Sequence, residues 1–326
     1  MTLRRLGCTK VQIGVQSLDA AILRMNDRKV TPEAIGKAFE LLRVFGFKIH
    51  AHFMVNLYGS SPEQDKLDYR RFVSEKAFQP DELKLYPCAL VKGTGLCRHF
   101  ADKTWQPYSE DELIDILKAD TLITPPFMRI SRMIRDISAH DILAGNTKAN
   151  LRQMVEKAIE GVGKNIAEIR YREVSTSEID IESLSLDVLQ YETTVSDELF
   201  LQWVTPDNRI AGFLRLSLPA PDYVHKHQPD LPVAPLEAMI REVHVYGKVA
   251  ELRKEADAAG EEQKAQAGKG VQHLGLGRQL IEAACGCAKA RGYRKVNVIS
   301  SVGTREYYRS LGFYDQGLYQ QRTLSP

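Results

Sequence analysis

Gln272-His273-Leu274-Gly275-Leu276-Gly277-Arg278 is the stretch that decides the fold of the C-terminal half of this 326-residue chain. The pattern Gln-x-x-Gly-x-Gly precedes apolar residues at helical spacing, namely Leu280, Ile281, Ala284, Cys285 and Ala288. Glycines let a backbone approach a ligand closely, and the free N–H groups of a helix that begins here point into the loop. The stretch therefore predicts a diphosphate-binding loop, with an ordinary glycine-rich helix start as the alternative.

The elements around this loop predict a mixed α+β domain. Upstream, strands are expected over residues 169–174, 188–195, 199–204, 210–218 and 238–246, with a loop at 220–235. Downstream, residues 295–300 read as a buried strand and 303–311 as a short helix. The order of loop, helix, strand and short helix, followed by Tyr-Tyr-x-x-x-Gly-Phe at 307–313, resembles the acetyl-CoA-dependent acetyltransferases of the GNAT superfamily.

This resemblance implies an acetyl-CoA site and a catalytic tyrosine. Residues expected around acetyl-CoA are Val245, Gln272, His273, Leu274, Gly275, Leu276, Gly277, Arg278, Tyr307 and Tyr308. One tyrosine of the pair would protonate the departing thiolate and the other would pack in the core; the sequence does not say which. Glu242 and His244, on the strand leading to the cofactor, would activate water or an acceptor, although Glu242 is equally suited to pair with an arginine.

The N-terminal half predicts a parallel sheet. Strands at 11–17, 50–57 and 83–86 alternate with helices at 31–44 and 61–76, and such an order gives right-handed crossovers. It looks like the back portion of a (β/α) barrel. We therefore expect three regions: part of a barrel at 1–85, a linker region at 86–165 and the acetyltransferase domain at 166–326.

A more specific resemblance covers nearly the whole chain. Several segments are similar to the catalytic subunit of Elongator, which joins a radical-SAM barrel to a GNAT domain: Gly14-Val15-Gln16-Ser17, residues 52–59, Lys84-Leu85-Tyr86-Pro87, Gly93-Thr94-Gly95-Leu96, residues 129–136, 241–247, 272–277 and 299–308. The family implies a tRNA uridine(34) acetyltransferase that uses acetyl-CoA and S-adenosylmethionine to place a carboxymethyl-type group on C5 of the wobble uridine, with tRNA-stimulated acetyl-CoA hydrolysis. In its mechanism a 5'-deoxyadenosyl radical abstracts hydrogen from the acetyl methyl, and the carbon radical adds to the base.

The cysteines depart from the family pattern. Radical-SAM enzymes hold an iron–sulfur cluster with Cys-x3-Cys-x2-Cys, and this chain has no such spacing. We therefore expect the cluster ligands to belong to an N-terminal part absent from this sequence. A second constellation, Cys88, Cys97 and His99, offers three zinc ligands. The alternative is two unrelated cysteines in a linker.

Two further sets of residues are implied by the resemblance. Polar residues near strand ends, where such barrels bind substrate, are Gln16, His52, Asn56 and Lys92. Between residues 127 and 172 there are nine Lys/Arg and five Asp/Glu, and the expected contacts to the anticodon stem-loop of tRNA are Arg129, Arg132, Arg135, Lys148 and Arg152. For each set, strand-end packing, ion pairs or a solvated face is the alternative.

Composition narrows the class of protein. There is no apolar run near 18 residues and no N-terminal signal region, so we expect no membrane span. Five cysteines, an odd number, favour a reducing cytoplasm over a disulfide framework. Expected partners are tRNA, acetyl-CoA and a second copy or accessory subunits. The rival functions are a protein lysine acetyltransferase and a tRNA-binding scaffold without catalysis.

Overall fold

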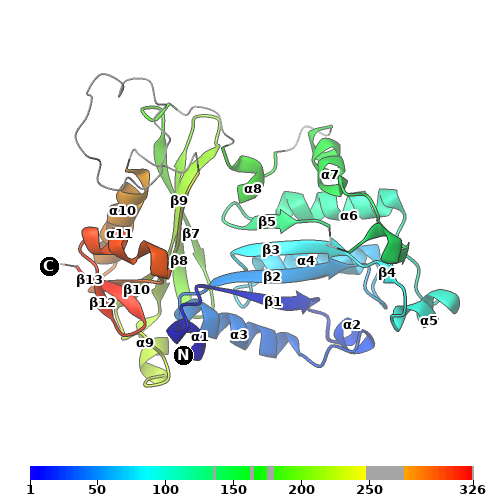
Figure 1. Ribbon diagram of the computed structural model, residues 1–326, viewed down its shortest axis with the longest axis horizontal. Helices are drawn as coiled ribbons and strands as arrows, with labels where there is room; N and C mark the ends of the chain where they lie inside the picture. Colours follow the sequence, from blue (N-terminus) through cyan, green and yellow to red (C-terminus); the bar gives the residue numbers. More distant parts are fainter. Residues whose placement is uncertain (135–136, 162–164, 175–179, 247–274, 325–326) are drawn as a thin grey trace, which may run out of the picture. The chain divides into compact units, whose positions relative to one another are not determined.

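The computed structural model describes residues 1–134, 137–161, 165–174, 180–246 and 275–324 (Figure 1). The chain divides into two compact units. The parallel-sheet unit comprises Cys8–Tyr171 and Glu192–Val195. The mixed-sheet unit comprises Met1–Gly7, Arg172–Tyr191 and Ser196–Pro326. Among the described helices, none combines the length and apolar character needed to cross a lipid bilayer.

Four parallel strands form the sheet of the first unit. Their order is β1 (Lys10–Gln16), β2 (Lys48–Val55), β3 (Glu82–Pro87) and β5 (Arg129–Arg132). The three strands expected from the sequence are confirmed, and β5 resolves the basic segment as a strand rather than a helix.

Helices cover one face of this sheet. Helices α3 (Pro32–Val44) and α4 (Pro62–Ser74) pack on β2, and α6 (Glu110–Ile123) packs on α4. Helix α2 (Ala20–Met25) instead packs through Ile22 against Met54 and Tyr86. Thr31 and Ser61 cap α3 and α4, each followed by a proline at the first helical position, as the sequence predicts. Beneath the helices, Phe53 of β2 stacks on Phe72 of α4 with ring centroids 5.0 Å apart. Because side chains alternate along a strand, the residues between these core positions face the other side of the sheet.

The remaining elements of this unit are short. They are the two-stranded sheet of β4 (Leu90–Val91) and β6 (Ile142–Ala144), α5 (Leu96–Ala101), η1 (Ala139–Asp141), α7 (Leu151–Glu160) and α8 (Ile169–Arg172). The strand predicted over 169–174 is wrong, since residues 169–172 are helical. The buried carboxylate of Glu168 accepts the backbone N–H of Arg170 at 2.8 Å and of Tyr171 at 3.2 Å, which starts a helical turn.

A seven-stranded sheet forms the second unit. In spatial order it contains β12 (Tyr314–Gln316), β13 (Tyr319–Thr323), β11 (Lys295–Val298), β10 (Glu237–Val245), β9 (Ile210–Pro219), β8 (Ser196–Val204) and β7 (Ser185–Glu192). Strands β10 and β11 are parallel neighbours, whereas β9 pairs with β10 and β13 pairs with β11 in the antiparallel direction. Helix α10 (Leu276–Ala290) packs on β8, β9 and β10 through its apolar stripe of Leu280, Ile281, Ala284 and Ala288.

The remaining four helical elements that the structure describes in this unit are short. Three are α1 (Thr2–Arg5), η4 (Val302–Thr304) and α11 (Arg305–Ser310), and the segment expected to be a loop at 220–235 contains the fourth, helix α9 (Pro221–Lys226). Pro221 at the first position of α9 explains why a proline-rich stretch still forms a helical turn. Strands β12 and β13 were not expected, because each is too short and too polar to show a period.

Candidate functional site

The glycine loop leads into a long helix, as its sequence predicts. Gly275 precedes α10 with φ 73°, in the left-handed region that favours glycine, and a Cβ there would meet open space. Leu276 is buried among Ala211, Trp203 and Val245, so it anchors the start of the helix. The N–H groups of the first turn have no partner within the helix, and the start of the helix is held in place by Leu276. Such a helix N-terminus can bind an anion. Gln272, His273 and Leu274 lie outside the described residues.

The sheet divides beside this helix end. Strand β10 pairs with β11 from Glu237 to Ile240, whereas its pairing with β9 continues to Val245. The described residues therefore place no strand on the β11 side of β10 beyond Ile240. We call this end of β10, past which β11 does not pair, the open edge of β10; it leads towards the first turn of α10.

The two tyrosines have different environments. A Cβ at Gly277 would lie 3.1 Å from the Tyr307 hydroxyl oxygen and 3.7 Å from a methyl of Val245, so Tyr307, Gly277 and Val245 meet at the open edge of β10. Partial burial raises the pKa of Tyr307, against a smaller opposite effect of the Arg278 guanidinium. Tyr308 is buried in the core, where its ring meets Phe313 at 5.7 Å and burial raises its pKa further.

Glu242 and His244 lie on the other face of β10 from Val245, which contacts the start of α10. Because faces alternate along β10, they share the face opposite to Val243 and Val245. The Glu242 carboxylate is 2.9 Å from the Nε of Arg215, a buried arginine. His244 is exposed and stacks on Phe213, with ring centroids 5.7 Å apart. Glu242 thus has the arginine partner that the sequence left as its alternative role.

The open face of the parallel sheet carries a polar group that the sequence reading missed in part. His52 Nε2 lies 3.1 Å from the side-chain oxygen of Gln12, and Lys84 Nζ donates to the same oxygen at 3.3 Å. Deeper in the sheet, the buried His50 meets the Ser131 hydroxyl at 3.2 Å. The signal for these residues was polar alternation at every second strand position, read across three neighbouring strands.

The other residues expected in a substrate pocket have mixed roles. Gln16 ends β1 with φ 70°, and its buried side-chain oxygen has no hydrogen-bond partner. Asn56 is buried: its amide nitrogen donates to the Gln106 carbonyl at 3.2 Å and its amide oxygen accepts the N–H of Tyr108 at 2.9 Å. Asn56 therefore fixes the segment after α5 rather than facing a ligand. Lys92 is exposed in the turn after β4.

The basic segment is only partly available to a partner. Arg132 is exposed at the end of β5, in register with Lys84, and Arg129 is half-buried at its start. Arg152 is committed to the fold, because its guanidinium bonds the carboxylates of Glu156 at 2.8 Å and Glu168 at 2.5 Å. Lys148 forms an ion pair with Glu110. Arg135 lies outside the described residues.

The structure does not assemble the proposed zinc site. Within the described ranges there is no group of three or more His, Cys, Asp or Glu residues that suits a metal ion. Cys88 packs on an apolar cluster with Met54 and Tyr86, and Cys97 Sγ lies 3.5 Å from the Val91 carbonyl oxygen. His99 stacks on Tyr58 at 3.8 Å. These three side chains are thus explained by local packing.

Comparisons with known proteins point to one family. Residues 80–161 match the family described as the Radical_SAM C-terminal domain. The tRNA uridine(34) acetyltransferase of Methanocaldococcus jannaschii is 34% identical over 328 residues, which cover 98% of this chain and 58% of the relative. Elongator complex protein 3 of Homo sapiens is 31% identical over 324 residues, covering 98% of this chain and 56% of the relative. The chain thus spans somewhat more than half the length of these curated relatives.

A solved structure extends the match to three dimensions. Elp3 of the archaeon Methanocaldococcus infernus, with residues 1–46 deleted, superposes with a TM-score of 0.86 at 32% identity, covering 99% of this chain and 74% of that chain. The expected fold class, part of a radical-SAM (β/α) barrel followed by a GNAT-type α+β domain, is confirmed. With such coverage of both chains, this protein belongs to the Elp3 family, whose members are named tRNA uridine(34) acetyltransferases and Elongator complex protein 3.

Proposed function

We propose that this chain carries the acetyl-donor site and part of the tRNA-binding surface of a tRNA uridine(34) acetyltransferase. The substrate is the wobble uridine, the donor is acetyl-CoA, and the product carries a carboxymethyl-type group on C5 of the base. The observation that carries the proposal is the open edge of β10 beside the first turn of α10, with the Tyr307 hydroxyl next to Gly277. Family membership supplies the tRNA substrate.

Acetyl-CoA fits this geometry in two ways. The diphosphate needs several N–H donors and a positive end of a helix dipole, which the first turn of α10 supplies with Arg278 beside it. The amide-containing arm of CoA is extended, and it can run alongside the end of β10 past which β11 does not pair. Together these contacts would direct the thioester along β10 towards Tyr307.

Tyr307 is the residue that we assign to the departing thiolate. Its pKa is raised, so the phenol stays protonated at neutral pH and can donate its proton as the thioester C–S bond breaks. Tyr308 is buried in the core, and its role is to pack against Phe313. Glu242 is neutralised by Arg215, so it lacks the character of a base for a lysine acceptor. That pairing argues against the rival protein lysine acetyltransferase.

S-adenosylmethionine and an iron–sulfur cluster belong to the radical chemistry of the family. The five cysteines of this chain stand at positions 8, 88, 97, 285 and 287 and form no disulfide. They do not fit a cluster that needs three converging thiolates, and the described residues bring no three such ligands together. No step of the proposal therefore passes through the cluster. The polar group of Gln12, His52 and Lys84 is the part of the barrel face that we assign to substrate.

Acetyl-CoA binding measured by calorimetry tests the donor site. Gly275→Glu places a carboxylate and a strained left-handed residue at the start of α10, so we expect the Kd for acetyl-CoA to rise at least tenfold. Gly292→Glu is the matched control, because Gly292 has φ 82° in open space at the other end of the same helix. An equal loss of affinity in both variants would mean that strain, and not a ligand contact, explains the effect.

A further inference from the structure

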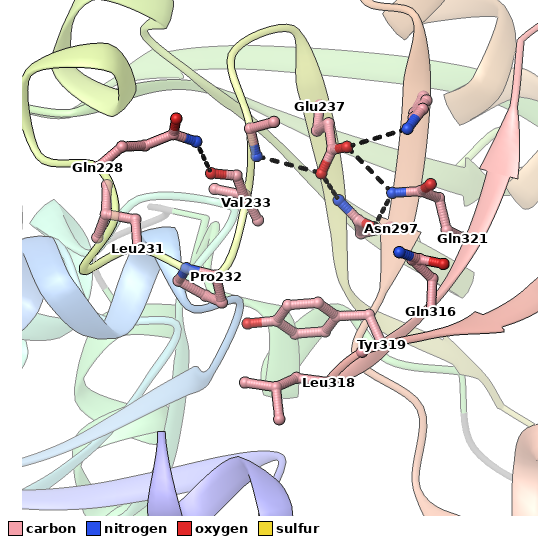
Figure 2. A pocket seen from close by; sticks show the side chains of 13 residues that line it. Gln228, Leu231, Pro232, Val233, Glu237, Asn297, Gln316, Leu318, Tyr319 and Gln321 are labelled. Atoms are coloured by element: carbon pink, nitrogen blue, oxygen red, sulfur yellow. Dashed lines mark hydrogen bonds and ion pairs between the residues drawn. The ribbon is translucent and has the colours of Figure 1, made fainter.

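A second hollow lies at the far end of β10 from the donor site. It has a volume of about 280 Å³ and lies where β10 begins at Glu237. The length of β10 places it on the order of 25 Å from Val245. Its polar lining comes from the loop after α9 and from strands β10 to β13 (Figure 2): Gln228, Glu237, Asn297, Gln316, Tyr319 and Gln321.

The charge of this pocket is already balanced. The Glu237 carboxylate accepts the amide nitrogen of Asn297 at 3.0 Å and that of Gln321 at 3.2 Å. It also accepts the backbone N–H of Ala234 at 3.2 Å and lies 3.5 Å from Lys295 Nζ. A carboxylate with four donors does not attract a cation, and a single lysine that pairs with it does not make an anion site. The ligand that fits is therefore neutral.

Side-chain amides give the pocket both donors and acceptors. Gln316 is exposed on β12 and lines the pocket. Gln228 donates to the Val233 carbonyl at 3.0 Å, which leaves its amide oxygen to accept. Behind them, the buried Gln321 and Asn297 are joined at 2.9 Å, so this wall is fixed. An amide offers a hydrogen-bond donor and an acceptor side by side, the pattern that matches the edge of a base.

An aromatic ring and apolar side chains complete the pocket. Figure 2 shows the Tyr319 ring reaching from β13 towards Pro232, with Leu318 beside it. Tyr319 is buried, with 6% of the residue exposed, and the Arg4 guanidinium lies 5.4 Å from its ring centroid, so the ring is a fixed part of the pocket wall. Leu231 and Pro232 line the side that the ring approaches. A flat ring of a bound ligand could thus contact apolar side chains with its faces and side-chain amides with its edge.

We propose that this amide pocket binds a single nucleobase, presented by an unpaired nucleotide of the tRNA other than the one that is modified. The proposal rests on the proposed function for the identity of the RNA, whereas the base-binding chemistry rests on the pocket itself. Unpaired bases are recognised by contact on their faces and by hydrogen bonds to their edges. Here Leu231 and Pro232 supply apolar surface and the amides supply the hydrogen bonds. The volume is at the lower end of ligand pockets, which suits one base with its sugar and phosphate outside.

Saturation-transfer NMR with free nucleosides tests this pocket without any need for tRNA or turnover. Adenosine, guanosine, cytidine and uridine are added separately to the full chain, and N-acetylglycinamide serves as a peptide-like probe. Gln316→Leu removes the exposed amide, and Pro232→Trp fills the hollow. Gln190→Leu is the matched control, because Gln190 is exposed on β7 at the opposite edge of the same sheet. We expect at least one nucleoside to bind, with an affinity about tenfold lower in the first two variants and unchanged in the control.

Three outcomes would overturn the proposal: no nucleoside signal, an equal signal in all variants, or a stronger signal from N-acetylglycinamide than from any nucleoside. A second measurement links the pocket to RNA. The tRNA affinity of Gln316→Leu should fall while its salt dependence stays unchanged, because no phosphate contact is lost. The two proposals can fail separately. If the wild-type chain shows no tRNA-dependent acetyl-CoA turnover, the proposed function fails, whereas nucleoside binding to the pocket can still be observed.

Discussion

At the scale of single residues, adjacent tyrosines have opposite surroundings. Tyr307 is 43% exposed and its hydroxyl reaches Gly277, whereas Tyr308 is 8% exposed inside the core. Residues 307 and 308 both belong to the short helix α11, in which neighbouring side chains point about 100° apart. One of them therefore faces the loop and the other faces the sheet. The sequence Tyr-Tyr alone cannot show which tyrosine is exposed, because that depends on how α11 packs.

Tyr307→Phe should lower the rate of thiol release from acetyl-CoA in the presence of tRNA by about 100-fold, the usual size of a general-acid effect. The affinity for acetyl-CoA should change less than threefold, because the ring remains. Tyr308→Phe should keep a rate within threefold of wild type. The measurement is CoA thiol release under saturating acetyl-CoA. A larger loss in the Tyr308 variant would assign the acid role to Tyr308.

At the scale of secondary-structure elements, the parallel sheet holds a buried histidine. His50 lies in β2, and burial lowers its pKa to about 3. The positive charges of Lys10 and Lys84 and the neighbouring His52 lower this pKa further, whereas Glu82 raises it. In the unfolded chain His50 binds a proton below its ordinary pKa of 6.5. Its contribution to stability is therefore present above pH 6.5 and is lost as the pH falls towards 3.

His50→Gln should reduce this acid sensitivity. Between pH 7 and pH 4.5 the histidine accounts for about 3 kcal/mol of lost unfolding free energy, so the variant should lose that much less. Urea unfolding at the two pH values measures the difference. Asp65, whose pKa burial raises to about 6, acts in the opposite direction in both proteins and cancels in the comparison. Parallel losses in wild type and variant would contradict the assignment.

The same scale shows what the sequence can and cannot predict. Strands β1, β2 and β3 and helices α3, α4 and α10 follow from hydrophobic period and helix-end residues, because burial on one face leaves a regular pattern. The strand prediction for residues 169–172 was wrong, because the helical turn depends on the carboxylate of Glu168, which is buried by the tertiary fold. The polar group of Gln12, His52 and Lys84 also depends on strand register, which no single strand reveals.

At the scale of the whole chain, the local excess of positive charge overstates the available tRNA surface. Arg152 and Lys148 form ion pairs with carboxylates of the same unit. Arg132 is exposed at the end of β5, and we propose a phosphate contact at this position. A count of charges cannot separate the two cases, because pairing requires the fold. The residue types of Cys88, Cys97 and His99 likewise predicted a zinc site, and the described residues do not bring three such ligands together.

Arg132→Glu should weaken tRNA binding several-fold and lower the slope of log Kd against log salt by about 1. Lys37→Glu is the matched control, since Lys37 is exposed on α3, on the helical side of the same sheet. Filter binding over a series of salt concentrations gives both quantities. If the two variants behave alike, Arg132 is not at the interface.

Thiol release from acetyl-CoA by the wild-type chain, with and without tRNA, is the measurement that tests the central claim most directly. The proposed donor site and tRNA surface predict a rate that rises when tRNA is added and does not rise with a lysine-containing peptide. A rate that ignores tRNA, together with brisk acetylation of the peptide, would contradict the account and identify a protein acetyltransferase instead.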